Sequence, residues 1–213
     1  MPRPPSLYLV TDRRQAHGRP LAEVVQAALD GGADGVQLRE KDLLGAELLE
    51  LATALRQLTA RYGASLLVND RIDVALAADA DGVHLPRDGF PVPAARALLG
   101  AARLIAVSTH TPAEVTTAAA DGADFVVFGP VYATASKAAF DPPRGVEDLA
   151  RACAASAIPV LAIGGVTAAR TAAVRAAGAS GIAVISAIMA ADDPASAARE
   201  LSRALGTRVP PGR

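Results

Sequence analysis

The chain has 213 residues and a formal net charge of −1, and 51% of its residues are apolar although only 3% are aromatic. This length suits one compact domain, and the charge balance gives no reason to expect nucleic acid as the main partner. We also expect a cytoplasmic protein without a membrane span, because no signal peptide or long apolar run is visible and the single Cys153 cannot form an internal disulfide.

Short apolar runs alternate with alanine- and leucine-rich helical patterns along the whole chain. This alternation predicts a parallel sheet with crossover helices. The predicted strands cover residues 7–10, 35–38, 65–68, 82–85, 104–107, 125–128, 160–163 and 182–185. The predicted helices cover residues 21–28, 46–61, 71–78, 93–99, 112–120, 146–155, 168–177 and 194–205.

A weak internal repeat supports this count of eight strands. Segments of four residues, which begin at Gly32, Asp79, Gly122 and Gly178, each end a predicted helix and lead into an even-numbered strand. Four units of two strand–helix modules would close a barrel, whereas a doubly wound sheet usually has fewer strands and one switch-point site. We therefore predict an α/β protein with a single TIM (β/α)8 barrel over residues 1–205 and a flexible tail over 206–213.

The carboxyl ends of the strands of such a barrel converge on one face, so the polar residues that follow them are candidates for a shared site. Gln37, Arg39 and Lys41 alternate, which predicts that they project to one side of their strand. Together they could bind a pyrophosphate through charge-assisted hydrogen bonds. The alternative is an ordinary charged strand end, in which Arg39 and Lys41 pair with Glu40 and Asp42.

Asn69 and Asp70 directly follow the third predicted strand. An aspartate at this place can bind Mg²⁺, which usually takes one or two carboxylates together with phosphate oxygens and water. The alternative is a cap for the helix predicted from Arg71, a common role for both residue types.

The loop after the sixth strand contains Thr134, Ser136 and Lys137, which could bind a phosphate or could lie on a surface excursion. Gly164 and Gly165, after the seventh strand, could be simple turn residues. Together with Ser186, after the eighth strand, they could instead offer the backbone donors of the usual phosphate site of such barrels.

The three histidines are widely spread and do not predict a zinc site. We expect His17 to be solvated. His84 and His110 could be acid–base groups, but a structural role is the simpler expectation for each. Cys153 lies among alanines in a predicted helix and is expected to be a small core residue.

Taken together, these segments resemble the thiamine phosphate synthase family and its sister group, the thiazole tautomerases. The resemblance runs from Leu7 to Ile188 and rests on the ordered motifs Gln-Leu-Arg-Glu-Lys, Val-Asn-Asp, Gly-Val-His-Leu, Val-Ser-Thr-His, Phe-Gly-Pro-Val-Tyr and Ala-Ile-Gly-Gly-Val. It implies a Mg²⁺-dependent barrel that joins hydroxymethylpyrimidine pyrophosphate to thiazole phosphate and releases thiamine phosphate and pyrophosphate. In the family the pyrophosphate leaves first, and the thiazole nitrogen then captures the pyrimidine cation. A homodimer would also be allowed by the resemblance.

The resemblance implies a role for each site residue. The pyrophosphate would be held by Gln37, Arg39 and Lys41, the pyrimidine by Asn69 and the metal by Asp70. The pyrophosphate or the thiazole end would be contacted by Ser108, Thr134, Ser136 and Lys137. The thiazole phosphate would receive hydrogen bonds from Gly165, Ile185 and Ser186. Of these residues, the ones expected to act on the departing group are Arg39, Lys41, Ser108 and Lys137.

Two positions depart from the family patterns. Synthases commonly have a second metal-binding aspartate where this chain has Gly89, and Asp88, one residue earlier, could replace it. The catalytic histidine of the tautomerases would fall at Pro130, which cannot exchange protons. We therefore expect a synthase. The alternatives are a tautomerase-like isomerase that uses His84 or His110, and a ligand-binding or regulatory barrel without catalytic activity.

Overall fold

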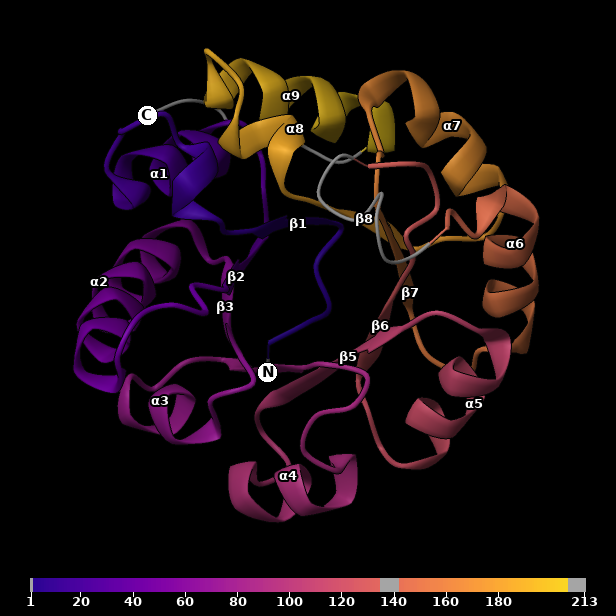
Figure 1. Ribbon diagram of the computed structural model, residues 1–213, viewed down its shortest axis with the longest axis horizontal. Helices are drawn as coiled ribbons and strands as arrows, with labels where there is room; N and C mark the ends of the chain where they lie inside the picture. The colour runs from indigo at the N-terminus through magenta and orange to yellow at the C-terminus, as the bar shows by residue number, and fades with distance from the viewer. Residues whose placement is uncertain (1, 135–141, 207–213) are drawn as a thin grey trace.

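The computed structural model describes residues 2–134 and 142–206 of the chain. Eight parallel strands close into a barrel in sequential order, and the helices form a ring around it (Figure 1). The strands are β1 (Leu7–Val10), β2 (Gly35–Leu38), β3 (Ser65–Asn69), β4 (Gly82–Leu85), β5 (Leu104–Thr109), β6 (Phe125–Phe128), β7 (Val160–Ile163) and β8 (Gly181–Val184). Because β8 pairs with β1, the sheet has no free edge. The predicted single-domain TIM barrel is confirmed.

The helices that cover the barrel agree with the predicted ones to within two residues at each end. They are α1 (Leu21–Asp30), α2 (Gly45–Tyr62), α3 (Ile72–Ala77), α4 (Val92–Leu99), α5 (Pro112–Ala120), α6 (Gly145–Ala155), α7 (Ala168–Ala176) and α9 (Pro194–Leu205). Two short elements were not predicted, α8 (Ser186–Met189) and the 3₁₀ helix η1 (Arg13–Gln15). Neither is long enough to show a helical periodicity.

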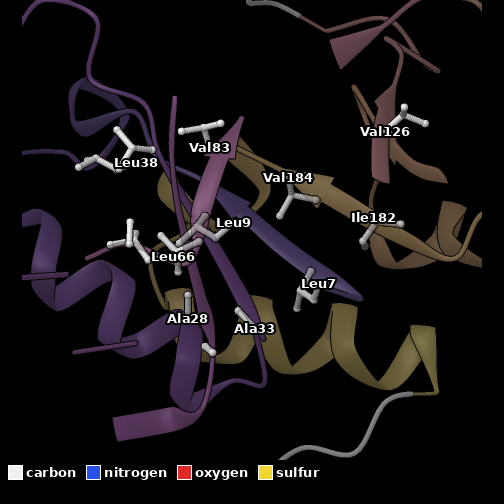
Figure 2. Close-up of a cluster of buried hydrophobic side chains, with 14 of the residues drawn as sticks. Leu7, Leu9, Ala28, Ala33, Leu38, Leu66, Val83, Val126, Ile182 and Val184 are labelled. Atoms are coloured by element: carbon white, nitrogen blue, oxygen red, sulfur yellow. The ribbon is translucent and has the colours of Figure 1, made fainter. Parts of the chain in front are cut away.

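The strands divide the buried side chains into two layers. Leu7 and Leu9 belong to the outer layer, between the strands and the helices, which Figure 2 shows in close-up. Tyr8 and Val10 belong to the inner layer, which fills the barrel. Successive residues of a strand face opposite sides, and both sides of this sheet are covered. This explains why the strands read as continuous apolar runs rather than as alternating patterns.

The internal repeat has a structural explanation at the amino ends of the strands. In three of its four units, an aspartate carboxylate accepts the backbone N–H of a residue near the start of the preceding odd-numbered strand, and the aspartate N–H donates to the carbonyl of that same residue. The pairs are Asp34 with Leu7, Asp81 with Leu66 and Asp124 with Ile105, with carboxylate distances of 2.8, 2.8 and 2.6 Å. The fourth unit has Ser180, whose N–H donates to Val160.

The last helix ends at Leu205, and Gly206 follows it in the left-handed conformation. The rest of the predicted tail, residues 207–213, lies outside the described residues. The domain boundary at residue 205 therefore stays a prediction. Within the described residues, no helix combines the length and the apolar character that crossing a membrane requires.

Candidate active site

A cavity of about 450 Å³ opens at the carboxyl ends of the strands. The predicted residues that line it come from five strands or the loops that follow them. They are Gln37, Arg39 and Lys41 after β2, Asn69 and Asp70 after β3, Asp88 after β4, Ser108 on β5 and Ile185 after β8. His84 and His110 line it as well. Residues that are far apart in the sequence are thus brought together on one face of the barrel.

The two cations of the first motif line this cavity, and they have no carboxylate partner among the described residues. The two carboxylates next to these cations in the sequence, Glu40 and Asp42, both form ion pairs with Arg13 of η1. Arg13 Nη1 lies 3.1 Å from Glu40 and 2.7 Å from Asp42. Among the described residues, neither Arg39 nor Lys41 forms an ion pair. The alternative in which these cations pair with Glu40 and Asp42 is therefore wrong. Both positive charges are available to an anion in the cavity.

Asp70 has an unusual backbone and a solvent-exposed carboxylate. Its φ is 63°, in the left-handed region, and its N–H donates to the carbonyl of His84 at 2.9 Å. Helix α3 has Arg71 as its N-cap and no side-chain cap, so the helix-cap alternative for Asn69 and Asp70 is wrong. Within the described residues the Asp70 carboxylate makes no hydrogen bond. A strained residue at a cavity is typical of a functional position, and this carboxylate is available to a metal ion.

His84 lies at the floor of the cavity with 3% of its surface exposed. Its Nε2 is 2.8 Å from Ser108 Oγ, and its ring stacks on Tyr8 with the centroids 6.0 Å apart. Burial, and then the positive charge of Arg39, lowers the pKa of His84 from 6.5 to about 3. The ring is therefore neutral near pH 7, which makes it a weak general base there.

The hydrogen bonds of His84 indicate which nitrogen carries the proton. Its Nδ1 is buried and has no partner among the described residues. A buried N–H without an acceptor is rarer and costlier than an unused lone pair. The proton is therefore placed on Nε2, which donates to Ser108 Oγ. This leaves the hydrogen of the Ser108 hydroxyl free to be donated into the cavity.

His110 is fixed at the rim of the cavity by two contacts. Its Nδ1 contacts the carbonyl oxygen of Gly129, and its backbone N–H donates to Glu114 at 2.6 Å. A carbonyl can only accept, so Nδ1 carries a proton in this arrangement.

The two remaining side chains discussed above agree with expectation. His17 is exposed. Cys153 packs against the core, and burial raises the pKa of its thiol to about 11.

The loop after β4 is a tight turn in which Gly89 N–H donates to the carbonyl of Pro86 at 3.0 Å. A Cβ at Gly89 would lie 2.8 Å from Pro86 Cδ, so no side chain fits there unless the loop moves. Asp88 pairs with Arg87 at 2.8 Å, and this hydrogen bond from Arg87 lowers the pKa of the Asp88 carboxyl. Asp88 is thus the carboxylate that this loop offers to the cavity.

The donors in the cavity suit Mg²⁺. The described residues contain no group of three or more histidine, cysteine, aspartate or glutamate side chains placed to hold a metal. Asp70 and Asp88 nevertheless line one cavity. Mg²⁺ usually takes one or two carboxylates and completes its coordination with phosphate oxygens and water, so two carboxylates in one cavity that also contains Arg39 and Lys41 are a fitting donor set.

A second, smaller cavity of about 280 Å³ shares Ile163 and Ile185 with the first. Its lining includes Thr134, Gly164, Gly165 and Ser186, whose phosphate-binding role stays a prediction. Ser136 and Lys137 lie outside the described residues.

The glycine pair is required by the close approach of two loops. Gly164 has a φ of 97°, and a Cβ there would lie 2.6 Å from the Cα of Pro130. The N–H of Tyr132 donates to the carbonyl of Gly164 at 3.0 Å, which ties the loop after β6 to the loop after β7. The glycines therefore do more than turn the chain, because they shape the wall of the second cavity.

Arg170 also lines the second cavity and was not predicted. It lies in α7 rather than directly after a strand, where the predicted site residues lie. Its position in the first turn of the helix that follows the Gly-Gly pair is the signal that could have found it.

Comparisons with known proteins agree with the geometry. Residues 7–188 match the family model described as thiamine monophosphate synthase. A protein of Geobacter sulfurreducens is 55% identical over 97% of this chain and 95% of its own length. The thiamine-phosphate synthase of Moorella thermoacetica is 47% identical, over 92% and 93% respectively. The solved structure of thiamine phosphate pyrophosphorylase from Pyrococcus furiosus superimposes with a TM-score of 0.86 at 38% identity, over 94% of this chain and 95% of that one. The chain belongs to the thiamine monophosphate synthase family.

Proposed function

We propose that this protein is a thiamine-phosphate synthase, a transferase that joins hydroxymethylpyrimidine pyrophosphate to thiazole phosphate and releases pyrophosphate. The observation that carries the proposal is the pairing of two adjoining cavities. The larger one contains Arg39 and Lys41, which have no carboxylate partner in the described part of the chain, together with the exposed carboxylate of Asp70. The smaller one has Gly165 and Ser186 in its wall. One cavity suits a pyrophosphate with its metal and the other a phosphate monoester.

In the proposed reaction, Gln37, Arg39 and Lys41 bind the pyrophosphate, and Asn69 orients the pyrimidine. The bond between the pyrimidine methylene carbon and the pyrophosphate oxygen breaks, and the electron pair leaves with that oxygen. The lone pair of the thiazole nitrogen then forms the new carbon–nitrogen bond. No protein nucleophile is needed, and the main task of the site is to stabilise negative charge on the departing group.

Ser108 is proposed to donate its hydroxyl hydrogen to that departing charge, since His84 occupies the other side of its oxygen. Asp70 and Asp88 would hold Mg²⁺, with Asp88 in place of the aspartate that is missing at position 89. When bound, Mg²⁺ supplies positive charge to the pyrophosphate oxygens. Thr134, Gly165, Ile185 and Ser186 are proposed to bind the thiazole phosphate. The roles of Ser136 and Lys137 stay predictions, as do a homodimer and a cytoplasmic location.

One assay tests the reaction directly. The purified protein is mixed with hydroxymethylpyrimidine pyrophosphate, thiazole phosphate and Mg²⁺, and thiamine phosphate is followed by fluorescence after oxidation. We expect multiple turnovers that stop when a chelator is added. Absence of product with both substrates intact would favour the isomerase or the binding protein. His84 is a poor candidate for the isomerase base, because a pKa of about 3 makes it a very weak base.

A further inference from the structure

We infer that Arg170 binds the phosphate group of the second substrate and makes the protein select a phosphorylated thiazole over the corresponding alcohol. The inference rests on the proposed function for the identity of the substrate. It does not rest on that function for the chemistry of the ligand, which is a phosphate monoester.

Arg170 is the single charged side chain among the described residues that line the second cavity. The other polar side chains of its wall are the hydroxyl residues Thr134, Thr167 and Ser186. A cation in such a wall attracts an anion, and no carboxylate in the wall opposes it. The charge of the cavity therefore favours a phosphate over a neutral group of similar size.

The guanidinium is held in place by two contacts that do not neutralise it. Its Nη1 donates to the carbonyl oxygen of Gly165 at 2.7 Å, and its Cζ lies 4.5 Å from the centre of the Tyr132 ring. Neither partner carries a negative charge, and within the described residues Arg170 forms no ion pair. By contrast, Arg96 forms an ion pair with Asp124, with Nη2 and Oδ2 2.6 Å apart. Arg170 is thus a positioned donor that keeps its full positive charge.

The position of Arg170 in the first turn of α7 adds to this preference. The helix runs from Ala168 to Ala176, and its N-cap Thr167 lines the same cavity as Arg170. Unpaired N–H groups at a helix start favour an anion, and a guanidinium can supply further donors to the same phosphate oxygens. The charged arginine and the helix start therefore act on one ligand group.

The two cavities would then hold two separate anions. Arg39 and Lys41 supply positive charge in the larger cavity, and Arg170 supplies it in the smaller one. Loss of Arg170 should weaken the binding of a phosphorylated thiazole while the binding of the pyrimidine pyrophosphate stays unchanged. This separation makes the role of Arg170 testable independently of turnover.

The test is titration calorimetry with thiazole phosphate and, separately, with the thiazole alcohol. Wild-type protein is compared with Arg170→Ala, Arg170→Lys and the control Arg175→Ala. Arg175 belongs to the same helix but lies outside both cavities, near the carbonyl of Ser180. We expect Arg170→Ala to raise the Kd for thiazole phosphate about 10- to 100-fold, the size typical of a charge-assisted hydrogen bond, and to leave the alcohol unaffected. Arg170→Lys should recover part of the loss, and Arg175→Ala should bind as wild type does.

Two outcomes would overturn the inference. One is equal affinity of wild type and Arg170→Ala for thiazole phosphate. The other is an equal loss for phosphate and alcohol, which would mean that Arg170 only supports the shape of the Gly165 loop. Circular dichroism of each variant checks that the fold is intact.

Inorganic phosphate serves as the probe that separates this inference from the proposed function. If wild type binds inorganic phosphate but not thiazole phosphate, and Arg170→Ala loses that binding, the phosphate role stands and the proposed function fails. This comparison is made in the Arg39→Ala background, which weakens anion binding in the larger cavity. If Arg170→Ala there leaves the binding of inorganic phosphate unchanged, the phosphate role fails whatever the reaction is.

Discussion

His84 Nε2 lies 2.8 Å from Ser108 Oγ, and this contact joins a buried, neutral ring to a hydroxyl at the floor of the cavity. Because the ring donates through Nε2, the hydroxyl of Ser108 is directed to donate its own hydrogen to an anion above it. His84 would then act on the departing pyrophosphate only through Ser108.

This relationship predicts the outcome of a double-mutant cycle. Ser108→Ala should lower kcat about 100-fold or more, as removal of a donor to developing negative charge typically does. His84→Phe should lower kcat less, and it should cost nothing further in the Ser108→Ala background. His84→Gln, which keeps an N–H donor, should recover part of the loss. Additive effects of the two single variants would show that His84 does not work through Ser108.

The buried ring also predicts a pH dependence of stability. The pKa of His84 falls from 6.5 to about 3 on folding, so the unfolded chain binds more protons than the folded chain between these values. The contribution of His84 to stability is therefore complete above pH 6.5 and is lost as the pH falls toward about 3, at no more than about 1.4 kcal/mol per pH unit.

Urea unfolding at about pH 7 and about pH 5 measures this contribution. The stability of the wild type should decrease between the two pH values by about 1–2 kcal/mol more than that of His84→Phe. The comparison removes the effect of carboxyl groups that titrate in the same range in both proteins. Equal decreases would mean that His84 titrates normally in the folded chain.

The separate roles of charge and backbone at Asp70 can be tested by one conservative change. Asp70→Asn removes the negative charge but keeps a residue type that tolerates the observed left-handed backbone. We expect kcat/KM to fall about 100-fold or more, with a melting temperature close to that of wild type. Arg39→Ala should show a similar loss. Unchanged turnover in both variants would contradict the assignment of this cavity.

Much of this site could be predicted from the sequence, because alternation and strand ends are local patterns. Gln37, Arg39 and Lys41 line one cavity, as their period-two alternation led us to expect, although β2 ends at Leu38 and the two cations follow it. The left-handed backbone of Asp70 could not be read in the same way, so from Asn69 and Asp70 alone a helix cap was the favoured interpretation. Arg13 reaches Glu40 across 27 residues, and no local pattern signals such a contact. Arg170 was missed because a charged residue in a helix is usually solvated.

The loop after β4 predicts opposite effects for its two charged residues. Arg87 lies 2.8 Å from the carboxylate of Asp88 and would compete with a bound metal ion for it. Asp88→Ala should raise the Mg²⁺ concentration needed for half-maximal activity, and Arg87→Ala should lower it. Mg²⁺ titrations of initial rate measure both. If neither variant changes the Mg²⁺ concentration needed for half-maximal activity, water or substrate oxygens take the place of a second carboxylate.

A glycine-to-aspartate change at position 89 of the same loop would restore the residue that synthases commonly have there, but it is not expected to restore metal binding by that residue. A side chain at position 89 would contact Pro86 at 2.8 Å, so the loop would have to move before any carboxylate there could reach a metal. We expect Gly89→Asp to leave the Mg²⁺ requirement unchanged or raised. A lowered requirement would mean that this turn rearranges easily.

The repeated aspartates at the other end of the barrel predict a purely structural effect. The Asp81 carboxylate accepts the N–H of Leu66 at 2.8 Å and lies 3.4 Å from Arg56. Asp81→Ser imitates the fourth unit of the repeat and removes a charge-assisted hydrogen bond at the start of β3. The free energy of unfolding should fall by about 1.5–3 kcal/mol, while kcat stays near the wild-type value because the active site lies at the opposite ends of the strands. Asp121→Ser, at an exposed residue after α5, is the matched control and should change stability by less than about 0.5 kcal/mol. Equal stability of the Asp81 and Asp121 variants would show that the repeat does not depend on its carboxylates.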